Sequence, residues 1–146
     1  MTMNEDFTRG FFNIDLIVIH HVPTFGSKTI DELLTEANLE AKFKTLDTPP
    51  IIHYEGKIVG VDVEIEFLTD QTGSRQDTVL EVQKGLHAEA LRYVSILVEN
   101  TLELVVDDIG TIQDGPPIIV QVPTPAAYIF QKCLSFTRRR DKQKAS

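Results

Sequence analysis

The chain has 146 residues, of which 42% are hydrophobic and 25% charged, and this is typical of a soluble globular protein that can bury a core in a single domain. Its one cysteine, Cys133, excludes an internal disulfide framework and is typical of a reducing compartment. The sequence has neither the roughly 20-residue apolar run of a membrane helix nor a signal-peptide pattern. We therefore expect a cytoplasmic protein with no membrane partner.

The formal net charge of −8 excludes a protein coated in basic residues for binding nucleic acid. The charge is nevertheless uneven, because residues 137–144, "TRRRDKQK", hold five basic residues and one acidic residue. Without this net +4, the rest of the chain carries −12. Such a run is typical of a solvated helix end or tail, and a phosphate or nucleic-acid contact is the less favoured alternative. We expect one domain over residues 1–146, with a basic C-terminal segment at 137–146.

The first half of the chain predicts one helix between strands. Residues 11–20 are rich in Ile, Val and Phe, which predicts a largely buried strand. Residues 28–46 carry apolar side chains at helical spacing, and this predicts a helix that ends before Pro49 and Pro50. Residues 55–57, Glu-Gly-Lys, predict a hairpin turn, which is followed by an alternating strand over 59–67.

The second half predicts further strands and two more helices. Apolar residues spaced along 86–98 predict an amphipathic helix. Thr124 followed by Pro125 is typical of an N-cap and the first residue of a helix. The remaining predictions are a loop at 71–77 and strands at 78–82, 101–106 and 118–122. This order predicts an α+β domain with a mixed, largely antiparallel sheet and helices packed on it.

Acidic residues on two of the strands are the candidates for chemistry. Asn13 and Asp15 are two residues apart in the first strand, so their side chains project from the same face. Asp62, Glu64 and Glu66 likewise share one face of the later strand. If the two strands are neighbours, one face of the sheet gathers these carboxylates. Mg²⁺ prefers such oxygen ligands together with substrate phosphates, and a two-metal site can align a displacement at phosphorus.

A simpler interpretation of the later strand is a half-exposed antiparallel strand with a solvated acidic face, and for that strand alone it is the favoured one. Asp15 shifts the balance toward a site, because burying a carboxylate in an apolar strand costs several kcal/mol unless it is paired. His53 stands alone in the sequence and is predicted to be structural or exposed.

Three stretches of the chain resemble a known family: "TRGFFNIDLIV" at 8–18, "VEIEFLTD" at 63–70, and the region from "GLHAEALRYVSILVEN" to "IIVQVPTPAAYIFQKCLSF". In their order and spacing they resemble the nucleotidyltransferase superfamily, which has the polymerase-beta-like fold. More closely, the chain is similar to stand-alone bacterial and archaeal nucleotidyltransferase-like proteins, some of which are toxins of toxin–antitoxin pairs.

The resemblance implies Mg²⁺-dependent, or Mn²⁺-dependent, transfer of a nucleoside monophosphate from an NTP to a hydroxyl of a protein or RNA acceptor. It implies that Asp15 and Glu66 are catalytic and that Asp15, Asn13 and Glu66 bind the metal. Glu66 would be the third carboxylate, which helps to activate the acceptor hydroxyl. A toxin-like member would also have an antitoxin as its protein partner.

The sequence departs from the family pattern at Asn13, where the family has an acid. The resemblance also implies an upstream helix with a Gly-Gly or Gly-Ser turn, and further C-terminal helices, so we expect a core trimmed at both ends. Two other hypotheses therefore stay open. One is a catalytically degraded module of this fold that binds nucleotide or protein, and the other is an unrelated α+β interaction domain.

Overall fold

The computed structural model describes residues 12–19, 21–24, 26–43, 52–71, 79–106 and 117–144, with side chains as far as residue 136. The chain divides into two compact units, each of which we describe by itself. Unit 1 consists of Met1–Thr69 and Gly73–Leu91. Unit 2 consists of Asp70–Thr72 and Arg92–Ser146.

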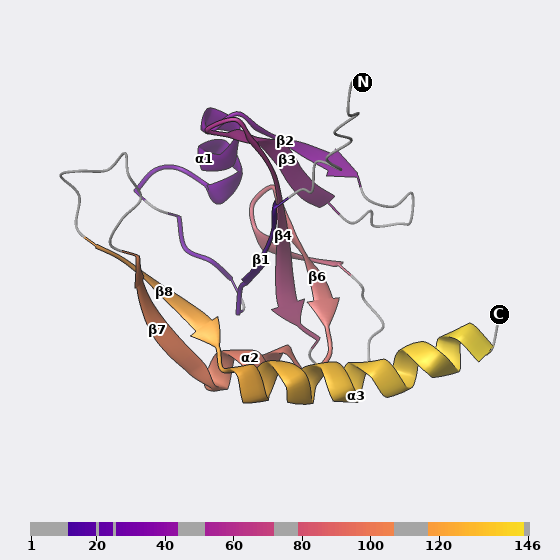
Figure 1. Ribbon diagram of the computed structural model, residues 1–146. Coiled ribbons are helices and arrows are strands. Elements are labelled where there is room, and N and C mark those ends of the chain that lie inside the picture. Colours follow the sequence, from indigo (N-terminus) through magenta and orange to yellow (C-terminus); the bar gives the residue numbers. More distant parts are fainter. Residues whose placement is uncertain are drawn as a thin grey trace, which may run out of the picture. The chain divides into compact units, whose positions relative to one another are not determined.

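Unit 1 is built on a mixed sheet that is covered in part by one helix, α1 (Ile30–Glu36) (Figure 1). Its main path has the order β2-β3-β4-β6-β5, and β1 pairs with β4 beside this path. β1 runs parallel to β4, whereas the pairs β2–β3, β3–β4 and β5–β6 are antiparallel. The strands are β1 (Phe12–Ile17), β2 (Leu39–Phe43), β3 (Ile52–Ile58), β4 (Val61–Asp70), β5 (Val79–Gln83) and β6 (Leu86–Leu91). The prediction of an α+β fold with a mixed, mostly antiparallel sheet is confirmed.

The core of unit 1 lies on one face of this sheet. Along β4, Val63, Ile65 and Phe67 are buried, and they alternate with half-buried residues of the opposite face. The Tyr54 ring from β3 meets Phe67 edge-to-face, with 6.0 Å between the ring centroids. The same core cluster includes Leu39, Val82, Leu86 and Ala88. Because every second residue of β4 is committed to this core, its acidic residues are confined to the other face.

Helix α1 is fixed at its start by polar contacts. Thr29 is the N-cap and forms a capping box with Glu32, and the hydrogen bond from the Thr29 backbone lowers the pKa of the Glu32 carboxyl. Asp31 accepts a hydrogen bond of 2.7 Å from the hydroxyl of Tyr54. Burial, together with this hydrogen bond, raises the pKa of Tyr54, so the hydroxyl stays a donor. The helix is thereby tied to the core side of β3.

Gln83 fixes the segment that joins β1 to α1. Its side chain is buried, its Oε1 accepts from the backbone N–H of Ile30 at 2.7 Å, and its Nε2 donates to the carbonyls of Val22 and Pro23. A buried amide satisfied in this way replaces the backbone partners that an irregular segment lacks. The chain that leaves β1 is therefore held against β5.

Unit 2 contains α2 (Val94–Glu99), the antiparallel hairpin of β7 (Thr101–Val106) and β8 (Ile118–Pro123), and α3 (Pro125–Lys144). As predicted, Thr124 caps α3, and its Oγ1 accepts from the backbone N–H of Ala127 at 3.2 Å. None of the helices in the described part of the chain combines the length and the apolar run that a membrane crossing needs.

Two predicted helices are wrong over much of their length. The helix predicted over 28–46 is α-helical only as α1, because Asn38 adopts a positive φ of 61° and the chain continues as β2. The helix predicted over 86–98 is β6 followed by the short α2. In both places the apolar positions fit helical spacing, but pairing with a neighbouring strand decides the conformation.

Two further predictions about the strands are wrong. Residues 55–57 are not a turn, because β3 runs through them and reverses at Val59 and Gly60. β1 is a strand but not a buried one, since Phe12, Ile14 and Leu16 are 67%, 41% and 40% exposed. In the described part of the chain β1 pairs only with β4, so it has the exposure of an edge strand. Most of the loop predicted at 71–77 lies outside the described residues.

The β3–β4 turn carries a residue that its backbone disfavours. Val59 has a φ of 50° and Gly60 a φ of 80°, as in a type I′ turn, yet β-branched residues rarely adopt a positive φ. Val59 is also 87% exposed, so little packing is lost when it is replaced. We expect Val59→Asn to raise the free energy of unfolding by about 1 kcal/mol, as measured by urea denaturation.

The matched control is Val61→Asn, which places the same residue two positions later, inside β4. Asparagine is disfavoured in a strand, so this variant should be neutral or destabilised. Equal effects of the two variants would contradict the explanation by turn geometry.

Candidate functional site

The pairing of β1 with β4 brings the candidate acidic residues together. In this parallel pair Asn13 is opposite Glu64, and Asp15 is opposite Glu66. Residues at paired positions project from the same face of a sheet, and neighbouring strands lie about 4.8 Å apart. Asp15 and Glu66 therefore present their carboxylates side by side on the face that is not buried in the core. We call this surface the acidic face.

The acidic face combines an exposed edge with a half-buried centre. Asn13 and Asp15 on β1 are exposed, whereas Asp62, Glu64 and Glu66 on β4 are half-buried. A half-buried carboxylate is less screened by water than an exposed one, so its interactions with nearby charges are stronger. The acids of β4 are thus not simply a solvated strand face.

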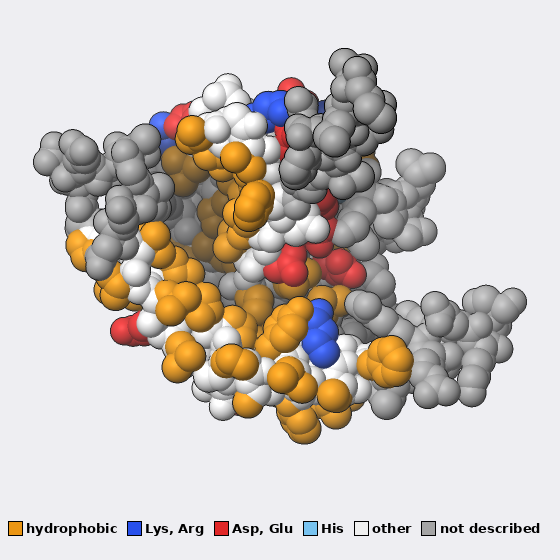
Figure 2. All heavy atoms as spheres, viewed as in Figure 1, with side chains coloured by type: hydrophobic (Ala, Val, Ile, Leu, Met, Phe, Trp, Pro, Cys, Tyr) orange, Lys and Arg blue, Asp and Glu red, His pale blue; other side chains and the backbone are white. Residues whose placement is uncertain are grey.

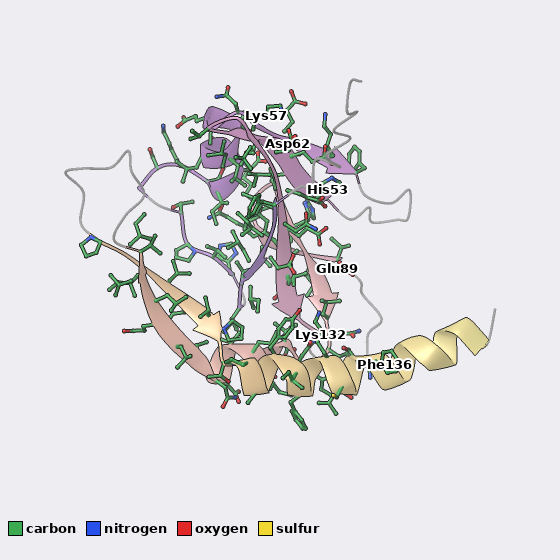
Figure 3. The ribbon with its side chains drawn as sticks, in the orientation of Figure 1. His53, Lys57, Asp62, Glu89, Lys132 and Phe136 are labelled. Carbon is green, nitrogen blue, oxygen red and sulfur yellow. The ribbon has the colours of Figure 1, made fainter. Side chains whose placement is uncertain are left out.

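Strand β3 supplies partners for the acids from the other edge of β4. Over residues 63–66, β4 pairs with β1 and also with β3, so it runs between them. Lys57 is opposite Asp62, and its Nζ lies 2.6 Å from Asp62 Oδ1. Figure 3 shows these two residues at the end of the hairpin, with His53 further along β3. One acid of β4 is therefore neutralised within the hairpin.

His53 lies next to the pair of Asp15 and Glu66. It is opposite Glu66 in the β3–β4 register and is only 7% exposed. Its Nε2 is 2.6 Å from Oε1 of Glu55, while its buried Nδ1 has no hydrogen-bond partner in the described part of the chain. The carboxylate of Glu55 thereby orients the imidazole within the acidic face.

Sequence reasoning missed this role of β3. His53 was predicted to be structural or exposed because it stands alone in the sequence, whereas the pairing of β3 with β4 places it opposite Glu66. The signal was present in "IHYEGKI", where His53, Glu55 and Lys57 alternate with Ile52, Tyr54, Gly56 and Ile58.

Strand β2 extends the polar rows of this face. Lys42 is opposite His53, and Glu40 is opposite Glu55. Lys42 and Glu40 form an ion pair of 2.7 Å, which lowers the pKa of the Glu40 carboxyl and raises that of the Lys42 ammonium group. Acids still outnumber basic residues on this face across β1, β2, β3 and β4. The acids are Asp15, Glu40, Glu55, Asp62, Glu64 and Glu66, and the basic residues are Lys42, His53 and Lys57.

The donors that β1 and β4 bring together are oxygen atoms. Among the described residues, no group of three or more His, Cys, Asp or Glu side chains is arranged around a common metal position. Asp15, Glu66 and Asn13 instead offer two carboxylates and one amide oxygen. Mg²⁺ and Mn²⁺ are bound in this way, by one or two carboxylates with substrate phosphates completing the coordination.

Comparison with known proteins identifies the family of the chain. A family model described as "Nucleotidyltransferase" matches residues 2–146, almost the whole chain. The chain belongs to this nucleotidyltransferase family. No curated protein and no solved structure matches it at the significance required.

The basic end of this nucleotidyltransferase lies in unit 2. Its helix α3 includes residues 137–144 of the predicted basic segment, but their side chains, like residues 145–146, lie outside what the structure describes. Lys132, on the described part of α3, lies with its Nζ 5.1 Å from the centre of the Tyr128 ring. It is therefore part of an aromatic and cationic surface of unit 2.

The register of β1 and β4 predicts a pair of opposite effects on stability. Like charges directly opposite each other destabilise a sheet, so Asp15→Asn should raise the free energy of unfolding by about 0.2–1 kcal/mol in EDTA. Asn13→Asp, which creates an acid opposite Glu64, should lower it by a similar amount. Urea denaturation at low salt measures both effects.

Both effects should shrink in 1 M NaCl, where the screening length falls to about 3 Å. A loss of stability in Asp15→Asn under metal-free conditions would contradict the account, since it would show that the carboxylate is stabilised by a protein group.

Proposed function

We propose that the chain transfers a nucleoside monophosphate from an NTP to a hydroxyl group, with Mg²⁺ or Mn²⁺ bound at Asp15 and Glu66. The observation that supports this most is the register of β1 and β4, in which Asp15 lies opposite Glu66. The family match supports nucleotidyl transfer in general, and the metal and the acceptor are our proposal.

Two oxygen-bearing strands provide the ligands. Asp15 and Glu66 would hold the cation through their carboxylates. Asn13 would add an amide oxygen, which is also a ligand for hard cations. Bound there, the cation would supply charge stabilisation for the triphosphate and the pyrophosphate that leaves. The surplus of carboxylates on the acidic face favours binding of a cation over binding of a bare anion.

The reaction requires one proton acceptor from the chain. The acceptor oxygen forms a bond to the α-phosphorus of the NTP, and the bond from that phosphorus to the oxygen bridging to the β-phosphate breaks. Pyrophosphate leaves with the electron pair of that bond, and the hydroxyl proton passes to the carboxylate of Glu66. Glu66 is suited to this role because it is half-buried between β1 and β3, next to His53.

Asn13 favours a second candidate function. It stands where the resemblance implies an acid, and it gives the proposed site one negative charge fewer to balance a cation and a triphosphate. The same residue would be compatible with a protein that binds nucleotide at the acidic face without transferring it. The transfer assay below separates the two candidates.

We expect the protein to transfer label from an α-labelled NTP to an acceptor only when Mg²⁺ or Mn²⁺ is present. Asp15→Ala should lower the rate by more than about 100-fold, because even residues that only orient metal ligands contribute about 10–100-fold. Product is measured by gel separation of labelled RNA or protein acceptors. Thermal shifts with metal and NTP report binding separately.

The matched control is Glu40→Gln, which removes an acid from the same face on β2, two strands away from Glu66. It should keep the wild-type rate. Transfer that is unaffected by Asp15→Ala would contradict the proposed site, and stabilisation by NTP without any transfer would favour the binding-only candidate.

Asn13→Asp tests whether the missing acid limits the reaction. If the metal binds between β1 and β4, this variant should bind Mn²⁺ more tightly and transfer nucleotide several-fold faster than the wild type. The same variant is expected to be less stable in EDTA, so a gain in activity could not come from a more stable fold. Weaker Mn²⁺ binding in Asn13→Asp would contradict the placement of the metal beside β1.

A further inference from the structure

Helix α3 presents a stripe of aromatic and basic side chains away from its buried side. Ala127 and Gln131 are 7% and 5% exposed and define the buried side. Tyr128, Lys132 and Phe136 are spaced by four residues, so they follow one another along one flank of the helix, about 6 Å apart. All three are exposed, Tyr128 by 51% and Phe136 by 60%. We call them the α3 stripe.

The α3 stripe alternates aromatic rings with positive charge. Lys132 lies over the ring of Tyr128, with 5.1 Å between Nζ and the ring centre, which is within cation–π range. Figure 3 shows Lys132 and Phe136 on successive turns of α3, and Figure 2 shows a basic side chain among hydrophobic ones over this helix. On this flank of the helix a cation therefore separates the two rings.

Charge is concentrated at the end of the same helix. Arg139 and Arg140 follow Phe136 by three and four residues in the sequence of α3. Residues 137–144 carry a net +4, in a chain whose remaining residues carry −12. A polyanion would therefore be attracted to this helix and repelled elsewhere, which fixes where it binds.

We propose that the α3 stripe binds single-stranded nucleic acid, so that RNA is the acceptor class for nucleotidyl transfer. The role of RNA as acceptor rests on the proposed function, whereas the binding of RNA by the α3 stripe does not. Exposed rings two helical turns apart can each stack on a base, and the cation between them can neutralise a phosphate. A rigid duplex keeps its bases stacked inside and offers no faces to these rings.

The test measures fluorescence anisotropy of a labelled oligouridylate of about 20 nucleotides with the full chain at several salt concentrations. We expect the single strand to bind more tightly than an RNA duplex of equal length. Phe136→Ala should weaken binding roughly tenfold through the loss of one stacked base. Lys132→Gln should reduce the slope of log K against log salt by about 0.7, as for one lost phosphate contact.

Phe130→Ala is the matched control. Phe130 is 56% exposed on α3, but lies six residues before Phe136 and so on a different side of the helix. It should bind as the wild type does, and circular dichroism should show equal helix content in all variants. An equal loss of oligouridylate affinity in Phe130→Ala and Phe136→Ala would contradict binding at the α3 stripe. Absence of oligouridylate binding at low salt, or binding only to vesicles of anionic lipid, would overturn the proposal.

Asp15→Asn separates this inference from the proposed function. The variant should bind the oligouridylate as the wild type does while losing transfer. If the wild-type protein binds RNA but transfers nucleotide to no acceptor, the result would support the α3 stripe and contradict the enzymatic proposal. Transfer to a protein acceptor without RNA binding would contradict the stripe and support the enzymatic proposal.

Discussion

The pairing of β4 with β1 and β3, which run in opposite directions, is the constraint on which the rest of unit 1 depends. β1 lies parallel to β4 and β3 lies antiparallel to it, so the register of each partner is fixed against the same strand. A shift of one residue would move every side chain of the shifted strand to the other face. Because Val63, Ile65 and Phe67 are buried, such a shift is costly, and the acids of β4 stay where they are. The core thereby sets the position of the candidate site.

The acidic face follows from this arrangement without any strained geometry. Asp15 lies opposite Glu66 because β1 and β4 pair residue by residue without a bulge. His53 enters the same row from β3, with Glu55 holding its ring. Asp15 and Glu66 lie directly opposite each other, and like charges in such positions destabilise a sheet, a cost that natural proteins accept mainly at functional sites. This pair is the physical basis of the proposed site.

The sequence predicted the parts of the molecule that depend on local pattern. The alternation in "VDVEIEF" predicted β4 and its acidic face, and Thr124 with Pro125 predicted the start of α3. Long-range pairing was not predictable from one sequence: residues 39–43 and 86–91 have apolar spacing compatible with helices and become strands because β3 and β5 pair with them. The role of His53 was hidden in the same way, since its neighbours come from β2 and β4. Asp15 was found for a reason that was partly mistaken, because β1 is exposed and not buried.

The most direct measurement of the central claim is Mn²⁺ binding followed by the electron paramagnetic resonance signal of the free ion, in a double-mutant cycle of Asp15→Asn and Glu66→Gln. Two ligands of one cation are energetically coupled, so each single variant should lose most of the binding and the double variant little more. Glu40→Gln, on β2 of the same face, should bind as the wild type does. Independent, additive losses in the two single variants, or an equal loss in Glu40→Gln, would contradict a cation shared by β1 and β4.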